Sequence, residues 1–262
     1  MQLDPAAIRA RVQLEAHAAL GSTNEAALAR ARAGERGPLW ITASRQTAGR
    51  GRRGRAWVSA PGNLYATLLL TDPSPPHRAA ELSFVAALAV HDAIMKLALA
   101  APAAPASVLR LAIKWPNDVL IGGAKCAGIL IEGEGASTAP LAVALGIGVN
   151  CAHHPSDLAF PATDLAVHGL AADPRDLFRV LSRTMLDRLA QWDRGNGFPA
   201  VRADWLQRAA GLSGPTRVLV GDQELEGRFE TLDGAGRLVL RLADGTMQAI
   251  AAGDVFPLAQ PA

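Results

Sequence analysis

The apolar run from Leu141 to Val149 constrains the fold more than any other segment, because no charged side chain interrupts it. A strand of this kind is buried on both faces of a covered sheet. Gly146 and Gly148 keep bulk out of the run, which indicates close approach by another backbone or by a ligand. We therefore expect a sheet that is packed on both sides.

Strand and helix patterns are interleaved over the first 210 residues. Alternating and β-branched runs predict strands, and apolar residues at three- and four-residue spacing predict helices. The expected strands are residues 38–43, 63–70, 109–115, 119–121, 124–132 and 141–150. The expected helices are residues 22–32, 81–97, 176–191 and 198–210, and residues 1–20 are expected to be weakly helical.

The pattern changes after Pro215 to short strands with Gly-Asp and Asp-Gly turns. Such strands are expected at residues 217–220, 225–230, 237–242, 247–250 and 255–258. Closely spaced short strands predict a small barrel. We therefore divide the chain into residues 1–213 and 214–262.

Composition narrows the kind of ligand. The 262 residues are 50% hydrophobic, and the formal net charge is only +2, so positive charge is local and favours a small anionic ligand over a polyanion. Cys126 and Cys151 are the only cysteines and lack metal-ligand spacing, so we expect no metal ligands and no disulfide. No signal peptide or membrane span is expected, and the predicted location is the cytoplasm.

The most chemically distinctive stretch is residues 46–57, where four arginines and three glycines fall within residues 49–55. Glycines let backbone N–H groups approach a ligand, and guanidinium groups bind carboxylate or phosphate oxygens in pairs. A solvated basic loop explains the run about equally well. An RNA-binding Arg-Gly segment is a third reading, but the run occurs once, and Trp57 and an apolar strand follow it.

Two other positions have plain structural explanations. Ser22 and Glu25 fit the spacing of a helix capping box, which alone would account for the Ser22-Thr23-Asn24 sequence. Lys125 follows the predicted Gly122–Gly123 turn, where a lysine usually faces solvent. Local sequence favours these readings over a binding role.

Five motifs in order closely resemble the motif set of biotin-protein ligases. They are Ser22-Thr23-Asn24, residues 49–55 with Trp57, residues 114–118 (KWPND), residues 125–130 (KCAGIL) and residues 146–150 (GIGVN). Residues 252–255 resemble the end of the family's C-terminal barrel. The resemblance implies an α+β fold, with a mixed sheet like that of class II aminoacyl-tRNA synthetases and then an SH3-like barrel.

The resemblance implies a two-step reaction. Biotin and MgATP give biotinyl-5'-AMP and pyrophosphate, and a lysine of the biotin carboxyl carrier protein of acetyl-CoA carboxylase then takes the biotinyl group. Both reacting groups of the first step are anionic and the carboxylate needs no general base, so positioning and charge neutralisation are the main tasks.

The resemblance also assigns residues. The catalytic residues would be Arg52 and Lys125. The biotin site would comprise Ser22, Thr23, Asn24, Gln46, Arg50, Gly51, Arg52, Lys125, Gly146 and Gly148. The nucleotide site would comprise Arg52, Arg53, Arg55, Trp57, Lys114, Asn117, Lys125 and Asn150.

Some features depart from the family or leave a choice open. Only 21 residues precede Ser22, too few for the winged helix of the DNA-binding members, so we expect no DNA-binding role. The 151–172 loop has no tryptophan to cover adenine, and Phe160 is its only aromatic residue. The oligomeric state, monomer or homodimer, is left open.

Two rival functions stand beside the ligase. A lipoate or octanoate transferase of the same superfamily is the first, but its Arg-Arg-x-Ser-Gly-Gly type of motif is absent. A non-enzymatic nucleic-acid-binding module is the second, and it leaves Lys125 and the glycine-rich strand unexplained.

Overall fold

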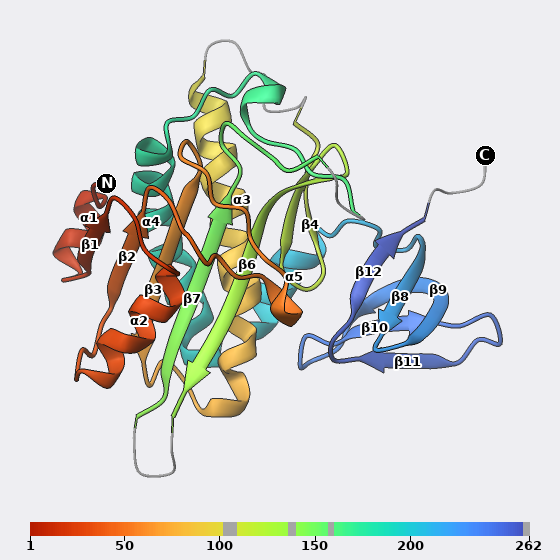
Figure 1. Ribbon diagram of the computed structural model, residues 1–262. Coiled ribbons are helices and arrows are strands. Elements are labelled where there is room, and N and C mark those ends of the chain that lie inside the picture. Colours follow the sequence, from red (N-terminus) through yellow and green to blue (C-terminus); the bar gives the residue numbers. More distant parts are fainter. Residues whose placement is uncertain (102–108, 136–139, 157–159, 259–262) are drawn as a thin grey trace.

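The computed structural model describes residues 1–101, 109–135, 140–156 and 160–258. In this part of the chain, one mixed sheet has the strand order β1–β2–β3–β7–β6–β5–β4 (Figure 1). Its strands are β1 (Gln13–His17), β2 (Leu39–Ala43), β3 (Leu64–Thr71), β4 (Leu111–Lys114), β5 (Asp118–Ile121), β6 (Ala124–Glu134) and β7 (Ala142–Val149). Strand β1 runs parallel to β2, and the other neighbours are antiparallel.

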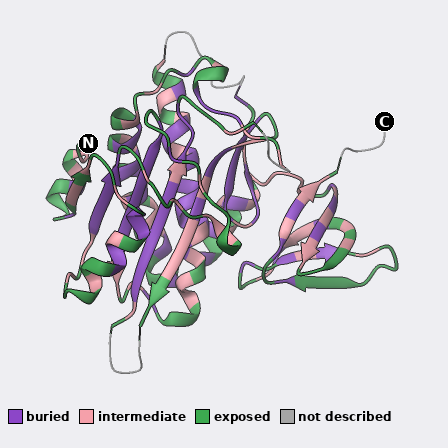
Figure 2. Cartoon of the chain, in the orientation of Figure 1, coloured by how far each residue is buried: buried purple, intermediate pink, exposed green. Residues whose placement is uncertain are grey.

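Strand β7 lies in the middle of this sheet, between β3 and β6, as its apolar sequence predicts. One face of the sheet carries α3 (Leu82–Ala100), α4 (Pro174–Trp192) and α5 (Phe198–Leu206) (Figure 1). The other face carries α2 (Thr23–Arg32), whose Ala27 and Leu28 pack with apolar residues of β2, β3 and β7. Figure 2 shows the resulting burial, with β2, β3 and β7 mostly buried, β6 mostly intermediate, and exposed residues on the outer sides of the helices.

Helix α3 is the core helix of the domain. By length and composition Pro76–Ala100 could cross a membrane, and it is the one segment among the described residues that could. Most of it is buried within the protein, where Phe84 contacts the aromatic rings of Phe198 and Trp205 edge to face. It therefore packs as the centre of a folded core.

The expectation for residues 1–20 is wrong in its second half. Helix α1 spans only Pro5–Arg9, and residues Gln13–His17 form edge strand β1. Arg11 has a φ of 58°, which stops the helix and turns the chain. The strand sequence has weak β propensity, so its backbone pairing with β2, and not local preference, decides its structure.

The chain after residue 214 forms a second, antiparallel sheet in the order β11–β10–β9–β8–β12. Its strands are β8 (Pro215–Val220), β9 (Gln223–Leu232), β10 (Leu238–Arg241), β11 (Met247–Ile250) and β12 (Asp254–Pro257), which confirms the five expected short strands. The indole Nε1 of Trp115 donates to the carbonyl of Gly236 at 2.9 Å. This buried contact attaches the small sheet to the main one.

Candidate functional site

A cavity of about 290 Å³ lies between the 46–57 loop, strands β6 and β7, and the end of the small sheet. Every residue predicted for the site lines this cavity except Arg53. Residues 253–256 also line it, so both sheets contribute to one site. The structure thus brings together motifs that are more than 200 residues apart in the sequence.

Neutral polar side chains form one wall of the cavity. Helix α2 begins at Ser22, whose side chain caps the N–H of Glu25, so the predicted cap is confirmed. The first turn of this helix places Thr23 and Asn24 in the wall, each 4% exposed. The backbone N–H of Thr23 donates to Oε1 of Gln46 at 2.8 Å, which links the helix to the loop.

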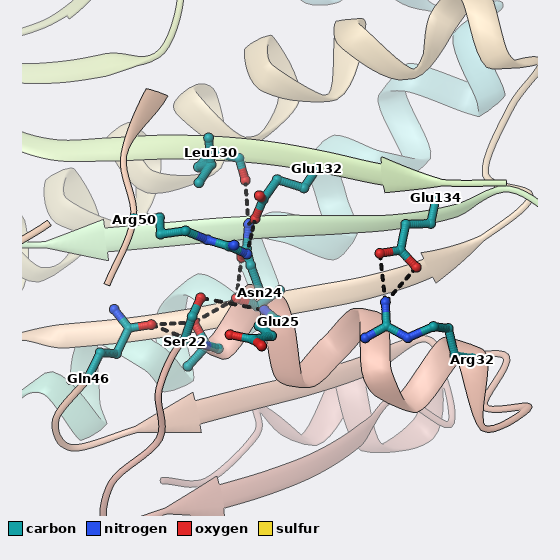
Figure 3. Close-up of polar contacts among 11 residues, drawn as sticks. Ser22, Asn24, Glu25, Arg32, Gln46, Arg50, Leu130, Glu132 and Glu134 are labelled. Atoms are coloured by element: carbon teal, nitrogen blue, oxygen red, sulfur yellow. Dashed lines mark hydrogen bonds and ion pairs between the residues drawn. The ribbon is translucent and has the colours of Figure 1, made fainter. Parts of the chain in front are cut away.

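The Asn24 amide is fully bonded within the protein (Figure 3). Its Nδ2 donates to the carbonyl of Leu130 at 3.2 Å and to Oε2 of Glu132 at 2.8 Å. Its Oδ1 accepts from the hydroxyl of Thr67 at 2.7 Å. Glu132 also pairs with Arg50 at 3.3 Å. Glu132, which the sequence did not predict as a site residue, therefore contacts two predicted site residues, Asn24 and Arg50.

Gly146 and Gly148 give room to protein side chains in this structure. A Cβ at Gly146 would lie 2.2 Å from Oδ1 of Asn24, and a Cβ at Gly148 would lie 2.5 Å from the indole of Trp57. A Cβ at Gly128, directly opposite Gly148 on β6, would lie 2.9 Å from the same indole. The three glycines therefore let Asn24 and Trp57 lie flat on the sheet.

Most of the positive side chains that line the cavity are paired with carboxylates. Arg50 pairs with Glu132, Arg55 with Asp254, and Lys114 and Lys125 with Asp118. Arg52 differs, because its Nη1 donates to the neutral Oδ1 of Asn117 at 3.0 Å. Burial lowers the pKa of Arg52, which nonetheless stays charged. Among the described residues, Arg52 is the cavity cation that has no carboxylate within ion-pair distance.

Asp118 was quoted in the 114–118 motif but given no role, and it organises the lysines. Its Oδ1 lies 2.6 Å from Nζ of Lys125, and its Oδ2 lies 3.2 Å from Nζ of Lys114. Burial works to raise the pKa of Asp118, but the two ammonium groups outweigh it and hold the pKa below the usual range. Lys125 is therefore fixed in the cavity, and the expectation of a solvent-facing lysine after the turn is wrong.

Three further residues were missed as site residues. Asp254 of β12 pairs with Arg53 at 3.0 Å and with Arg55 at 2.8 Å. Phe160 lies under the ammonium of Lys114, 3.9 Å from Nζ to the ring centre, and Phe256 is near it. Phe160 is visible in the sequence as the one aromatic residue of its loop, but nothing local indicates that Asp254 and Phe256 reach the same cavity.

The cavity therefore offers three kinds of surface. Neutral hydrogen-bonding groups surround Thr23, apolar side chains come from Ile129, Leu130 and Ile147, and cations surround Arg52. This combination suits a small molecule with a polar head, an apolar chain and an anionic end. In the described part of the chain, no group of three His, Cys, Asp or Glu side chains could hold a metal ion.

Comparison with known proteins places the chain among relatives of one kind. A model of the biotin/lipoate A/B protein ligase family matches residues 20–150, and a model of the biotin protein ligase C-terminal domain matches residues 215–256. The chain is 44% identical over 241 residues to the biotin–acetyl-CoA-carboxylase ligase of Paracoccus denitrificans, which covers 90% of this chain and 96% of the relative.

Solved structures agree with the fold. A biotin protein ligase from Aquifex aeolicus in complex with biotin and ATP has a TM-score of 0.76 and 23% identity, covering 94% of this chain and 99% of the other. The biotin protein ligase of Leishmania major in complex with biotinyl-5-AMP has a TM-score of 0.62 and 27% identity, covering 92% and 99%. The expected fold class, an α+β domain with a small C-terminal β domain, is confirmed.

Proposed function

Because this chain belongs to the biotin/lipoate A/B protein ligase family, we propose that it is an ATP-dependent biotin-protein ligase. In the first step a carboxylate oxygen of biotin bonds to the α-phosphorus of ATP, and pyrophosphate leaves. In the second step a lysine amine of the acceptor bonds to the acyl carbon, AMP leaves and the amine loses a proton. The name of the Paracoccus relative supports biotin over lipoate or octanoate.

The observation that carries this proposal is the convergence of Arg52 and Lys125 on one cavity with the buried Thr23 wall. Two anions must meet in the first step, and preorganised cations lower the cost of that approach. Arg52 has no carboxylate partner among the residues that the structure describes, which suits it to receive the biotin carboxylate and the α-phosphate together. Lys125 adds a second charge whose position Asp118 fixes.

We assign the neutral wall to the head of biotin and the far side of the cavity to the nucleotide. Ser22, Thr23, Asn24, Gln46, Arg50 and Gly51 line the first part. The second part is lined by Trp57, Arg55, Lys114, Asn117 and Asn150. Arg53 does not line the cavity, but it pairs with Asp254, which does. Phe160 and Phe256 supply the aromatic surface for adenine. The biotinyl-5-AMP bound by the Leishmania protein supports one site for both halves.

Magnesium enters as part of the substrate MgATP. This ion usually keeps several waters and binds through substrate phosphates with one or two carboxylates. A cavity with few free carboxylates fits that mode of binding, and no separate protein site is needed.

The partner we propose is the biotin carboxyl carrier protein of acetyl-CoA carboxylase, after the name of the Paracoccus relative. That relative is named as a ligase alone, which supports a chain that acts without binding DNA. We also propose that residues 1–213 and 214–262 form two domains, with the second supplying residues 253–256 to the cavity.

The test is ATP–pyrophosphate exchange by the purified chain with biotin, octanoate, lipoate or no acid. We expect biotin to drive exchange with a far higher kcat/KM than octanoate or lipoate, no exchange without an acid, and a loss of about a hundredfold or more in Lys125→Ala, since one preorganised charge is worth that much. Lys96→Ala, an exposed lysine on α3, is the matched control and should behave like the wild type. Exchange driven by octanoate or lipoate and not by biotin would refute the substrate, and no exchange with any acid would refute the enzyme.

A further inference from the structure

Glu132 does not line the cavity, yet it contacts two residues that do, Asn24 and Arg50 (Figure 3). We propose that Glu132 is a positioning residue: it fixes the orientation of the Asn24 amide and through it the hydrogen-bond polarity of the cavity wall that selects the acid substrate. This inference rests on the proposed ligase function. It adds a residue outside the cavity to the determinants of substrate choice.

The Asn24 amide is almost fully buried. Its Nδ2 faces the Leu130 carbonyl and the Glu132 carboxylate, and both of these groups only accept hydrogen bonds. A flipped amide would place its oxygen against two acceptors and leave its NH₂ facing the Thr67 hydroxyl. The carboxylate of Glu132, at 2.8 Å, and the more distant Leu130 carbonyl, at 3.2 Å, therefore select the same one of the two orientations.

The orientation of the Asn24 amide determines which groups donate and which accept in the neighbouring wall. Since Asn24 presents Oδ1 to Thr67, the buried Thr67 hydroxyl must donate to it at 2.7 Å. Because the one Thr67 hydrogen is used in this way, the contact between the Thr67 and Thr23 hydroxyl oxygens, 2.8 Å apart, can only be a donation from Thr23, whose single hydrogen is shared between Thr67 and Oε1 of Gln46 at 3.1 Å. Oε1 of Gln46 accepts a hydrogen bond from the backbone N–H of Thr23 at 2.8 Å. The Nε2 of Gln46 therefore points towards Ser59 and donates to its hydroxyl at 3.0 Å.

The cavity wall offers a ligand both hydrogen-bond donors and hydrogen-bond acceptors. One N–H of Gln46 and the lone pairs of Thr23 remain available at the cavity, since both residues line it. A cyclic urea needs a donor for its carbonyl and acceptors for its N–H groups, and this wall provides both. An alkyl acid without a urea would leave these buried groups unpaired, which is costly.

The contact of Glu132 with Arg50 is the weaker of its two roles. The Arg50 side chain is 44% exposed, and exposed ion pairs contribute little. The charge-assisted hydrogen bond from the buried Asn24 amide is the stronger interaction. A replacement of Glu132 that keeps a hydrogen-bond acceptor but removes the charge can therefore distinguish its contact with Asn24 from its contact with Arg50.

The experiment compares Glu132→Met, which removes the acceptor, with Glu132→Gln, which keeps an acceptor and removes the charge. In biotin-dependent exchange, we expect Glu132→Met to raise the KM for biotin about tenfold, with kcat and the KM for ATP within about twofold. Its preference for biotin over octanoate in kcat/KM should fall in proportion. Glu132→Gln should restore the KM for biotin to within about threefold of the wild type.

The matched control is Glu134→Gln, on the same strand and face, where the carboxylate pairs with exposed Arg32 at 2.7 Å (Figure 3). It should leave the KM for biotin unchanged. The inference is overturned if Glu132→Met keeps the wild-type KM, if it loses activity with all substrates equally together with thermal stability, or if Gln fails as Met does. Absence of biotin-dependent exchange in the wild type would instead refute the proposed function itself.

Discussion

A single buried carboxylate, Asp118, balances two lysines beside the reacting groups. In Asp118→Asn both ammonium groups would lose their counterion inside the cavity. Breaking a buried ion pair from one side typically costs several kcal/mol, and we expect a loss of about 3 kcal/mol at pH 7. Urea unfolding of the wild type and the variant measures it. A change below about 0.5 kcal/mol would mean that water, and not Asp118, stabilises the lysines.

The pH dependence of this effect has a definite sign. The lysines hold the pKa of Asp118 below its usual value of 3.8, against the opposing effect of burial. Its contribution to stability is therefore fully present above that value and is lost as the pH falls through the folded-state pKa. The stability difference between the wild type and Asp118→Asn should shrink below about pH 4.

Helices α3, α4 and α5 are joined behind the sheet by a second charged group. Arg188 of α4 pairs with Asp92 of α3 at 2.6 Å and with Asp204 of α5 at 2.5 Å, and its side chain is only 13% exposed. Arg188→Met would remove the nearest cation from both carboxylates and leave Asp92 with only the more distant Arg208, at 3.9 Å, so we expect about 3 kcal/mol of lost stability in urea unfolding.

The matched control for Arg188→Met lies on the same helix. Arg183 pairs with Asp187 one turn away, and both side chains are about half exposed, so Arg183→Met should cost less than about 0.5 kcal/mol. Biotin and ATP KM values should be unchanged in both variants, because neither residue lines the cavity. Equal losses in the two variants would show that the buried network adds nothing beyond surface pairing.

Sequence patterns predicted those elements whose structure is decided by their own residues. The apolar β7, the Gly122–Gly123 hairpin and the short C-terminal strands all have local signals, and all are observed. Strand β1 has none, because its pairing partner β2 lies more than twenty residues away. The motif resemblance predicted the residues that line the cavity. It could not predict Glu132 or Asp254, since their roles come from contacts across the sheet and between the two sheets.

At the scale of the molecule, the small C-terminal sheet completes the cavity of the main domain. Asp254 of β12 holds Arg53 and Arg55, which lie about 200 residues earlier in the arginine loop. Val255 accepts a hydrogen bond from Lys114 at 3.4 Å, and Phe256 lies beside Phe160. The loop that we propose to bind the nucleotide is thus attached to the second sheet through its own arginines.

Asp254→Asn should therefore release the arginine loop. The two ion pairs are partly exposed, so together they should favour the closed loop by only about two- to fivefold. We expect trypsin to cleave the unliganded variant within residues 50–55 faster by that factor, while the unfolding midpoint changes little. Asp244→Asn is the control, because Asp244 bonds Thr246 in its own turn, far along the chain from the arginine loop. If cleavage at residues 50–55 is no faster in Asp254→Asn than in Asp244→Asn, then the loop is ordered by its contacts with the main sheet, such as the packing of Trp57 on Gly128 and Gly148, and not by the second sheet.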